Sequence, residues 1–215
     1  MAGMAGVYER YGKRLLDAAG ATVMLVPAAP LMAGIAAVLW RTQGRPILFT
    51  QERVGRDGQT FTIYKFRTMV QGAQGQGAGM WFEPGDERVT PVGRFLRSSS
   101  LDELPQIWNV LRGDMSLVGP RPKPAEIVDR YRSRYAPTLR ARPGLTCLTA
   151  VEGRNTLRRS QMIALDQRYV DQISLLRDLV LLLRTVPVVL LRKGFFAEDE
   201  SEEWMEDVAP DWATT

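Results

Sequence analysis

The stretch AAGATVMLVPAAPLMAGIAAVLW, Ala18–Trp40, contains no charged residue. An apolar run of this length is typical of a helix that enters a lipid bilayer. Pro27 and Pro30 lie in its middle, where each removes a backbone donor and clashes with the preceding turn, so we expect a sharp kink or break. The residues that flank the stretch include basic side chains on both sides: Arg10, Lys13 and Arg14 before it, and Arg41, Arg45, Arg53 and Arg56 after it.

These flanks predict the course of the segment through the membrane. Lys and Arg accumulate on the cytoplasmic side, so both ends of the stretch are expected there. A helix of about 12 residues on either side of the prolines reaches only about 18 Å, against a hydrocarbon core of about 30 Å. We therefore expect a re-entrant helix-break-helix that dips into one leaflet and returns. A kinked helix that spans the bilayer remains an alternative, and a signal peptide is disfavoured because the apolar stretch is too long.

Composition limits the chemistry that the chain can perform. The 215 residues include one cysteine, Cys147, and no histidine. Disulfide frameworks, zinc fingers and histidine-dependent catalytic triads or dyads are therefore excluded. Any catalysis has to use carboxylates, Arg, Lys, hydroxyls or a metal held by oxygen. The length suits one compact body with an appended membrane element, and we expect a membrane region at 1–41, a main domain at 42–197 and an acidic tail at 198–215.

The formal net charge of +4 conceals an asymmetry along the chain. All 28 Lys and Arg lie at or before Lys193, whereas eight of the 24 acidic residues follow from Glu198 on, so residues 1–197 carry +12. A body that basic indicates an anionic partner, which could be nucleic acid, lipid headgroups or a phosphorylated substrate. The acidic end EDESEEWMED, Glu198–Asp207, is expected to be solvated and partly disordered.

The remaining patterns predict a mostly helical α/β fold with one small hairpin. Two β-rich runs in Arg45–Met69 surround a turn at Arg56–Gly58, which is typical of a β-hairpin. The glycine- and glutamine-rich stretch Gln71–Glu87 fits either a mobile lid or a plain connector. Helical patterns follow at Val92–Gly113 and at Ala125–Arg140.

Two later segments complete the expected fold. RPGLT, Arg142–Thr146, is read as a turn. The apolar run Ile173–Phe196 is interrupted by Arg177, Asp178, Arg184 and Pro187, which makes it too polar to cross a bilayer. It is expected to be an amphipathic helix lying at the membrane interface, with a buried core helix as the alternative.

The segment RSSSLDELPQIWNVLRGDMSLVGPRP, Arg97–Pro122, carries the clearest chemical signal. Asp102 and Glu103 are adjacent at the expected start of a helix. Ser100 and Glu103 also have the spacing of a capping box, which would give Glu103 a purely structural role. Arginines close in sequence, together with a helix N-terminus, favour a phosphate site. Carboxylates in such a site can hold Mg²⁺ or attack phosphorus directly. The arginines in question are Arg94, Arg97, Arg112 and Arg121.

Three blocks of the sequence resemble the bacterial sugar transferase family, the monotopic phosphoglycosyl transferases. They are KRLLD (Lys13–Asp17), QERVGRDGQTFTIYKFRTM (Gln51–Met69) and SLDELPQIWNVLRGDMSLVGPRP (Ser100–Pro122). Shorter matches in RPGLT, GRN, DQRYV and SLLRDL extend the resemblance over nearly all of Tyr11–Gly194. The chain looks like the small, minimal members of that family.

The resemblance implies a re-entrant membrane helix and a catalytic domain on the cytoplasmic face of the bacterial inner membrane, with both termini cytoplasmic. It also implies a ping-pong reaction. Asp102 would attack the sugar-linked phosphate of a UDP-sugar, UMP would leave, and a polyprenyl phosphate, expected to be undecaprenyl phosphate, would then attack the phosphosugar-aspartate. Glu103 would be the partner acid that helps hold Mg²⁺ or handles protons, so the implied metal ligands are Asp102 and Glu103.

The resemblance further implies a set of phosphate- or nucleotide-binding residues, contributed by several blocks: Lys65, Arg67, Arg97, Pro120, Arg121, Pro122, Arg142 and Arg154. The expected partners are a UDP-sugar, a polyprenyl phosphate and the bilayer, with a possible homodimer and no nucleic acid. The family's Ser-Pro pair at the membrane kink is Ala29-Pro30 here. The residues after RPGLT also differ, so the identity of the sugar does not follow. A non-catalytic scaffold and a membrane-tethered nucleic-acid binder remain alternatives.

Overall fold

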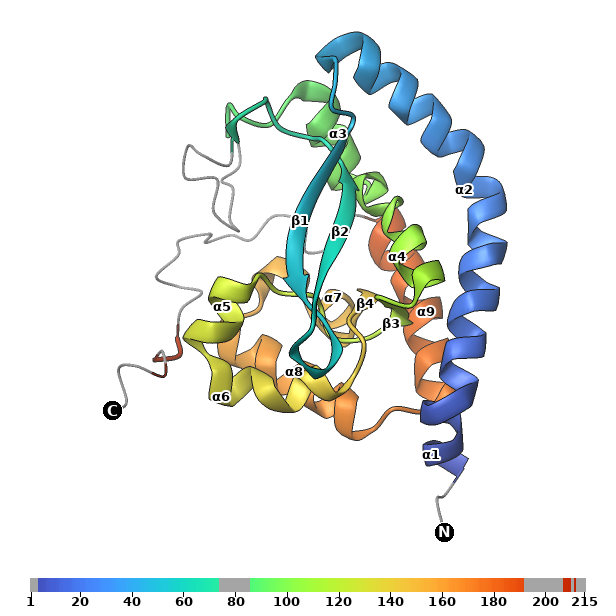
Figure 1. Ribbon diagram of the computed structural model, residues 1–215, viewed down its shortest axis with the longest axis vertical. Helices are drawn as coiled ribbons and strands as arrows, with labels where there is room; N and C mark the ends of the chain where they lie inside the picture. The colour runs from blue at the N-terminus through green and yellow to red at the C-terminus, as the bar shows by residue number, and fades with distance from the viewer. Residues whose placement is uncertain (1–3, 74–85, 192–206, 210, 212–215) are drawn as a thin grey trace.

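The computed structural model describes residues 4–73, 86–191, 207–209 and 211. Most of the glycine- and glutamine-rich loop predicted at 71–87 lies outside these residues, and so does most of the acidic tail at 198–215. Helices dominate the described part, and its two sheets have two strands each (Figure 1). The expectation of a mostly helical α/β fold is therefore confirmed.

A long N-terminal helix is the largest element. Helix α1, Met4–Val7, passes through a π turn at Tyr8–Gly12 into α2, Lys13–Gln43. In the described part of the chain, Tyr8–Gln43 is one helix long and apolar enough to cross a membrane, with a mean hydropathy of 2.1 and 17% of its most apolar 18 residues buried. Helix α2 ends at Gly44, whose backbone has φ of 68° and whose N–H donates to the Trp40 carbonyl at 3.1 Å.

Of the kink or break expected at the prolines, the break is wrong, because α2 runs without interruption through Pro27 and Pro30. The helix bends along its length instead (Figure 1). Proline removes one donor and displaces one carbonyl, but the hydrogen bonds on either side persist, and apolar surroundings penalise every backbone group left without a partner. The bend therefore replaces the expected helix-break-helix, and the re-entrant course stays a prediction.

The predicted hairpin is confirmed. Strands β1, Leu48–Val54, and β2, Thr60–Phe66, pair in antiparallel register. Their connection is the short 3₁₀ turn Arg56–Gly58, in which Asp57 has φ of 56° and Gly58 has φ of 79°. Glycine and aspartate tolerate this left-handed backbone, so the turn signal in the sequence had a direct physical basis.

Two helices flank the predicted carboxylate pair. Helix α3, Pro91–Ser98, leads into the 3₁₀ turn Leu101–Glu103, and α4, Gln106–Arg112, follows. Helix α4 ends at Gly113, whose φ of 90° lets its N–H reach the carbonyls of the last turn. The helical prediction for this region is confirmed, with an interruption that places the carboxylates between the two helices.

A second, parallel sheet lies beyond α4. Strand β3, Ser116–Val118, pairs with β4, Gly144–Thr146, so the predicted turn at RPGLT is wrong for its last three residues. The two backbones approach so closely that a Cβ on Gly144 would lie 2.1 Å from the Gly119 nitrogen. This contact joins segments far apart in sequence, which is why local turn signals misled the prediction.

The amphipathic stretch Ala125–Arg140 does not form the single helix that was predicted. It divides into α5, Ala125–Arg130, α6, Arg132–Tyr135, and a 3₁₀ segment, Ala136–Arg140. Tyr131 interrupts the helix with φ of −127° and ψ of 40°, and its ring is fully buried. Burial of this large ring therefore prevails over local helix propensity.

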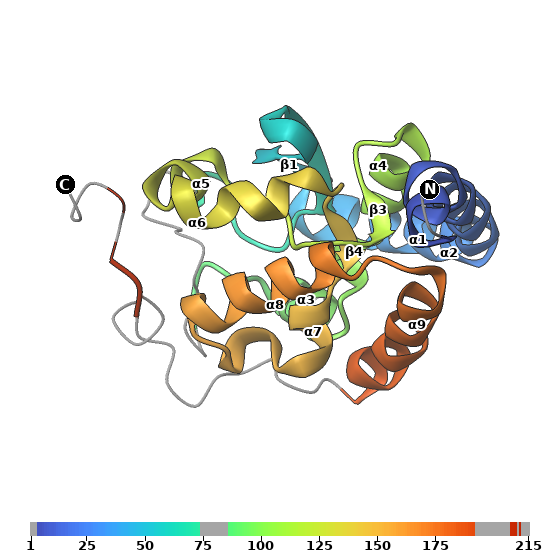
Figure 2. The same cartoon turned by 90° about the horizontal axis from the view of Figure 1, so that it is seen from below.

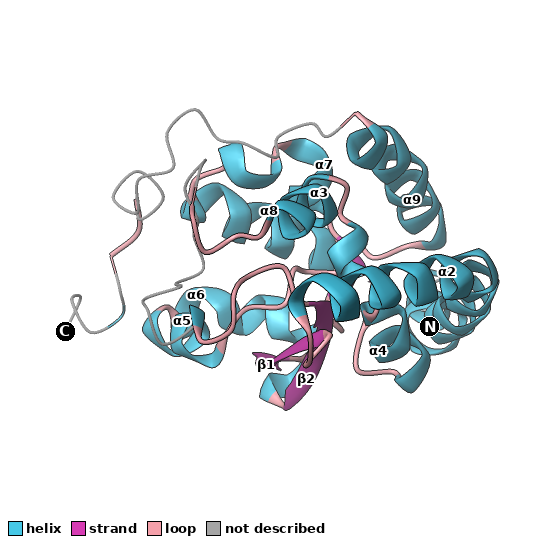
Figure 3. Ribbon diagram, turned by 90° about the horizontal axis from the view of Figure 1, so that it is seen from above, coloured by secondary structure: helices cyan, strands magenta, loops and turns pink. Residues whose placement is uncertain are grey.

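The C-terminal half ends in three helices, α7, Leu148–Glu152, α8, Arg159–Asp171, and α9, Leu175–Leu190. Helix α9 lies beside α2 (Figures 2 and 3). It buries Asp178 and Leu181 and exposes large apolar side chains on its other face. The alternative of a wholly buried core helix is therefore wrong. The exposed apolar residues of α9 include Leu176, Leu179, Leu183, Val186 and Leu190.

One hydrophobic core cluster joins the N-terminal helix α2 to the rest of the chain. It contains Ala21 of α2, Val110 of α4, Leu117 of β3, Tyr169 of α8 and Leu181 of α9. The N-terminal helix therefore packs into the same interior as the main domain, in direct contact with β3 and α4.

The described end of the acidic tail is packed against the body. The Asp207 carboxylate accepts hydrogen bonds from the Ser160 N–H, at 3.0 Å, and the Ser160 hydroxyl. Asp211 accepts the same two bonds from Ser133, each 2.7 Å long. Val208 is buried in a hydrophobic cluster that also contains Tyr131 and Tyr135. Asp207 itself is exposed, and the rest of the stretch predicted to be solvated, residues 198–206, lies outside the described part.

Candidate active site

The carboxylate pair sits on the turn between α3 and α4. Ser100 precedes it with a left-handed backbone, φ 57°, and its side chain makes no capping bond, so the capping-box alternative is wrong. Leu101 and Leu104 pack onto the core cluster that contains Phe66. Since these two leucines anchor the turn from one side, Asp102 and Glu103 between them are directed to other neighbours.

Two basic side chains hold Glu103. Lys65 of β2 places its Nζ 2.7 Å from Glu103 Oε1, and Arg121 places its Nη2 2.9 Å from the same oxygen. Burial opposes ionisation of Glu103, but Arg121 and Lys65 outweigh it and hold the pKa of this carboxyl well below its usual range. Glu103 is therefore ionised and neutralised by two cations.

Asp102 has a different environment. It is 8% exposed, and within the described part of the chain its carboxylate accepts no hydrogen bond. Burial raises the pKa of Asp102 above its ordinary value, and the neighbouring Glu103 adds to this rise, while Lys65 and Arg97 oppose it. The Asp102 carboxylate is thus desolvated and has oxygens available for a substrate or metal.

Arg97 and Arg154 complete the basic surroundings. Arg97 Nε donates to Thr68 Oγ1 at 2.8 Å, and its charge acts on Asp102. Arg154 Nη2 donates to Ser100 Oγ at 2.9 Å, directly before the carboxylate turn. Burial and the charge of Arg121 lower the pKa of Arg154, which reflects the crowding of cations. The structure therefore brings four of the predicted phosphate-binding cations to the pair.

The turn Pro120–Pro122 supplies Arg121 through a tightly held backbone. The Pro120 carbonyl accepts the Gly144 N–H at 2.9 Å, and the Gly119 N–H donates to the Thr146 carbonyl at 3.0 Å. The two prolines fix the backbone around Arg121. Their contribution to the site is thus conformational, and the guanidinium of Arg121 is the group that meets Glu103.

Arg53 is a site residue that the sequence suggested only as a membrane flank. Its Nη1 donates to the Pro122 carbonyl at 3.4 Å and its Nη2 to Gln51 Oε1 at 2.6 Å. Burial and the charge of Arg121 lower the pKa of Arg53 to about 10. The predicted hairpin could have revealed part of this arrangement. Alternate residues of a strand share one face, so Gln51 and Arg53 are expected side by side on β1.

Two predicted phosphate-binding residues lie elsewhere. Arg67 donates through Nη2 to the carbonyls of Gln43 and Gly44, which close the end of α2. Arg142 donates through Nε to the Gly113 carbonyl at 3.0 Å, beyond the C-terminal end of α4. Neither makes an ion pair with Asp102 or Glu103 in the described part of the chain, and both contacts serve helix ends.

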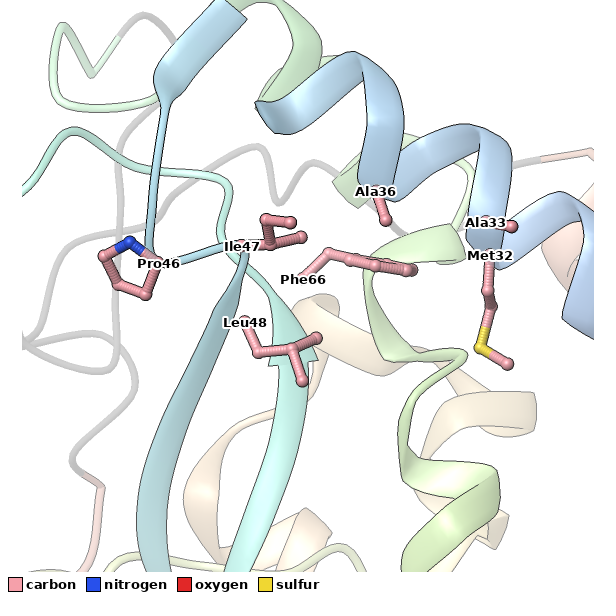
Figure 4. A pocket seen from close by; sticks show the side chains of 7 residues that line it. All are labelled: Met32, Ala33, Ala36, Pro46, Ile47, Leu48 and Phe66. Carbon is pink, nitrogen blue, oxygen red and sulfur yellow. The ribbon is translucent and has the colours of Figure 1, made fainter. Parts of the chain in front are cut away.

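An apolar groove of about 610 Å³ opens beside the C-terminal half of α2 (Figure 4). Its lining contains no charged side chain. Phe66, which follows Lys65 in β2, forms one wall. The groove is lined by Met32, Ala33, Ala36, Pro46, Ile47, Leu48 and Phe66.

The donor set fits a magnesium ion that is shared with a substrate. In the described residues no group of three or more His, Cys, Asp or Glu side chains could hold a metal. Mg²⁺ commonly uses only one or two carboxylates and completes its shell with water and substrate phosphates. The free oxygens of Asp102 satisfy the first requirement, and the basic surroundings favour the phosphates that would supply the rest.

Comparison with known proteins agrees with the geometry. The family model described as bacterial sugar transferase matches residues 8–192. The UDP-glucose:undecaprenyl-phosphate glucose-1-phosphate transferase of Caulobacter vibrioides is 45% identical over 186 residues, which cover 83% of this chain and 69% of that protein. The exopolysaccharide production protein ExoY of Rhizobium meliloti is 38% identical over 198 residues, or 86% and 88% of the two chains.

A further relative is considerably longer than this chain. The galactosyl transferase CpsE of Streptococcus agalactiae serotype III is 39% identical over 197 residues, which cover 85% of this chain but 43% of that protein. The chain thus spans less than half of some relatives and most of others. Because the family model covers α2, the carboxylate turn and α9, the chain belongs to the bacterial sugar transferase family.

Proposed function

We propose that this protein transfers a sugar-1-phosphate from a UDP-sugar to a polyprenyl phosphate, with undecaprenyl phosphate as acceptor. The reaction would be a first membrane step of glycoconjugate assembly. Family membership supports the proposal, and so do the relatives named undecaprenyl-phosphate galactose phosphotransferase in Salmonella typhimurium and glucose-1-phosphate transferase in Caulobacter vibrioides.

The division of roles between Asp102 and Glu103 is the observation that carries the proposal. Glu103 is bound by Lys65 and Arg121, whereas Asp102 is desolvated with unengaged oxygens. A nucleophile needs a free, poorly solvated lone pair, and a bound anion cannot supply one as readily. Asp102 is accordingly the nucleophile, and Glu103 holds Lys65 and Arg121 in position.

In the first step an Asp102 carboxylate oxygen attacks the phosphorus that carries the sugar. An oxygen–phosphorus bond forms to Asp102, and the bond from that phosphorus to the bridging oxygen breaks. The electron pair leaves with UMP. The cations around the pair stabilise the charge that develops on the phosphoryl oxygens and on the leaving phosphate. These cations are Arg53, Lys65, Arg97, Arg121 and Arg154.

In the second step a phosphate oxygen of the polyprenyl phosphate attacks the same phosphorus. The bond to the Asp102 oxygen breaks, which regenerates the free carboxylate and leaves a diphosphate that links sugar and lipid. When bound, Mg²⁺ held by Asp102 and Glu103 would neutralise charge on the donor diphosphate. Binding and orientation by Lys65 and the arginines are the contribution of the chain itself.

The carboxylate turn lies against α2, because Leu101 and Leu104 pack on the cluster that contains Ile35 and Leu39. Helix α2 exposes apolar side chains such as Val23 and Val26, and α9 exposes Leu176 and Leu183. Apolar surface of this kind on two helices beside each other suits contact with lipid. We propose that α2 enters the inner membrane from the cytoplasmic side and returns, with both termini cytoplasmic.

The competing functions predict different behaviour. A non-catalytic scaffold would keep the fold without turnover, and a nucleic-acid binder would use the basic surface alone. The deciding experiment places the purified protein in nanodiscs with Mg²⁺, undecaprenyl phosphate and a panel of UDP-sugars, and measures UMP. We expect UMP release with at least one donor. No release from any donor, combined with salt-sensitive binding of DNA or RNA, would support the nucleic-acid alternative.

A further inference from the structure

A buried network begins at Lys13, in the first turn of α2. Its Nζ donates to Asp178 Oδ2 at 2.6 Å, to the Val118 carbonyl at 2.9 Å and to the Tyr169 hydroxyl at 3.0 Å. An ammonium group has three donors, so every donor of Lys13 has a partner. The side chain is almost completely buried, with 8% of its surface exposed.

Asp178 of α9 is the counterpart and is fully buried. Besides Lys13 it accepts hydrogen bonds from the Tyr8 hydroxyl, at 2.6 Å, and from the Tyr169 hydroxyl, at 2.7 Å. The network therefore joins the start of the membrane helix to α8 and α9. A buried ion pair gains little stability over well-packed apolar side chains, because both charges lose their hydration. Stability alone is thus a weak reason for this arrangement.

The same network reaches β3, the strand that precedes the turn Pro120–Pro122. Val118, whose carbonyl Lys13 binds, is the last residue of β3, and Arg121 follows three residues later. One turn along α2, the Asp17 carboxylate accepts the Leu117 N–H and the Ser116 hydroxyl, both at 2.9 Å. Side chains from the first two turns of α2 therefore bind all three residues of β3.

The connection from Val118 to Arg121 has little freedom. The Gly119 N–H is fixed to the Thr146 carbonyl, and Pro120 and Pro122 restrict the backbone on either side of Arg121. A displacement of the Val118 carbonyl is consequently passed on to the Arg121 guanidinium, which lies 2.9 Å from Glu103.

We propose that Lys13 is a positioning residue: by binding the Val118 carbonyl it sets Arg121 against Glu103, and so couples the seating of the membrane helix to the catalytic pair. This inference rests on the proposed function, because its kinetic test measures UMP release. The Val118 carbonyl also accepts the Ser116 hydroxyl at 2.8 Å and the Tyr169 hydroxyl at 3.0 Å, but of these three donors Lys13 is the one that belongs to the N-terminal helix.

The test separates positioning from stability by neutralising both charges. Lys13→Met alone leaves Asp178 as an uncompensated buried charge, so it should lower the unfolding temperature. The double variant Lys13→Met/Asp178→Asn removes that charge and should recover the unfolding temperature in nanodiscs. Its kcat for UMP release should nevertheless remain at least tenfold below wild type, because the Val118 carbonyl has lost the Lys13 ammonium and keeps only the hydroxyls of Ser116 and Tyr169. Recovery of both properties would overturn the proposal.

The route through Arg121 is tested by combining variants. In an Arg121→Gln background, Lys13→Met/Asp178→Asn should lower kcat by no more than about twofold further, because both changes act on the same group. If the loss of kcat in the combined variant equalled the product of the two separate losses, Lys13 would not act through Arg121. The matched control neutralises the exposed pair Arg140–Asp171, whose side chains are each 62% exposed, and should keep kcat within twofold of wild type.

Tyr169→Phe provides a variant that leaves the ion pair intact. It removes the hydroxyl that accepts from Lys13 and lies within hydrogen-bond distance of the Val118 carbonyl and of Asp178, so we expect a threefold or larger loss of kcat together with a lower unfolding temperature, because one donor of Lys13 is left unpaired. If the double variant does not fold, an unchanged kcat in Tyr169→Phe overturns the inference.

The inference and the proposed function can fail separately. A wild-type protein that releases no UMP from any UDP-sugar contradicts the proposed function only. Hydrogen exchange then decides the inference. The Gly119 and Arg121 amides should exchange at least tenfold faster in Lys13→Met/Asp178→Asn than in wild type, with exchange in α8 unchanged. Equal rates at both amides would refute the positioning role.

Discussion

Asp102 and Glu103 are adjacent in the chain but differ in what surrounds them. Glu103 shares one oxygen with Lys65 and Arg121, which stabilise its ionised form. Burial raises the pKa of Asp102, whose carboxylate accepts no hydrogen bond in the described residues. Two carboxyl groups thus acquire opposite pKa shifts from their environment.

Replacing Asp102 by Asn tests the proposed nucleophile. An amide is a very poor nucleophile, so UMP release should fall by about three orders of magnitude or more. Steady-state UMP release with the best UDP-sugar measures this loss. Asp129→Asn, at a largely exposed carboxylate on the same protein, should leave the rate near wild type. Comparable losses in both variants would point to a general effect of charge removal.

The pH dependence of the reaction tests the electrostatics of Asp102. Its pKa is raised by burial, so the carboxylate becomes protonated, and loses its nucleophilicity, at a higher pH than the value of about 3.9 for an exposed aspartate. The rate should therefore fall as the pH drops through this raised pKa, and stay level above it. Lys65 lowers the pKa of Asp102, so Lys65→Met should move the acid limb to higher pH.

A profile of UMP release against pH provides the measurement. A wild-type rate that stays constant down to pH 4 would contradict the raised pKa. Glu103 should not contribute to the acid limb of this profile, because Arg121 and Lys65 keep its pKa below the pH range measured.

Much of the site could be predicted because its residues are close in sequence. The carboxylates, Arg97 and Arg121 all lie within one block, and adjacency of opposite charges is visible without a fold. The role of Arg53 depends on the face of β1 to which it belongs, and that of Arg142 depends on the pairing of β3 with β4. Such long-range contacts are not encoded in local spacing.

At the scale of elements, the parallel pair β3–β4 fixes the position of the turn Pro120–Pro122, which carries Arg121. A Cβ on Gly119 would lie 2.2 Å from the Arg142 carbonyl oxygen and 2.8 Å from the Gly144 nitrogen. Gly119→Ala should therefore separate the two strands and destabilise the protein by about 1–3 kcal/mol, the usual range for overpacking. Activity should fall as well, since Arg121 follows the strand.

Thermal unfolding and UMP release together measure the effect of Gly119→Ala. Gly34→Ala is the matched control, because a Cβ at Gly34 in α2 meets no atom within 4 Å. That control should be neutral or slightly stabilising, as alanine favours helix more than glycine does. A Gly119→Ala protein with wild-type stability would mean that the strands are less closely packed than described.

The elements differ in how well the sequence predicted them. The hairpin was predictable because its turn residues Asp57 and Gly58 tolerate positive φ. The break in α2 was not observed, because intrinsic proline effects gave way to the cost of unsatisfied backbone groups. The stretch Ala125–Arg140 was divided by burial of Tyr131, a tertiary contact that helical periodicity does not show.

At the scale of the whole molecule, α2 and α9 form one apolar side of the protein. The buried network from Lys13 to Asp178 joins them, and large side chains project outward from both. Such a surface is costly to expose to water, at about 25 cal/mol per Å² of apolar area. We therefore expect it to be covered by lipid.

Leu183→Glu should weaken this membrane contact, because Leu183 is 72% exposed on α9. Co-sedimentation with anionic vesicles should show reduced binding, by about tenfold or more for a carboxylate transferred toward an apolar phase. Gln172→Glu adds the same charge at an exposed position just before α9 and should bind nearly as well as wild type. Equal binding of Leu183→Glu and wild type would exclude α9 from the membrane surface.

The most direct measurement of the central claim is mass spectrometry of the covalent intermediate. Wild-type protein is mixed with UDP-sugar in the absence of polyprenyl phosphate, quenched and digested. The account predicts one equivalent of UMP and a sugar-phosphate mass increment on the peptide that contains Asp102, lost on addition of acceptor and absent from Asp102→Asn. UMP release that requires the acceptor, with an unmodified Asp102 peptide throughout, would contradict it.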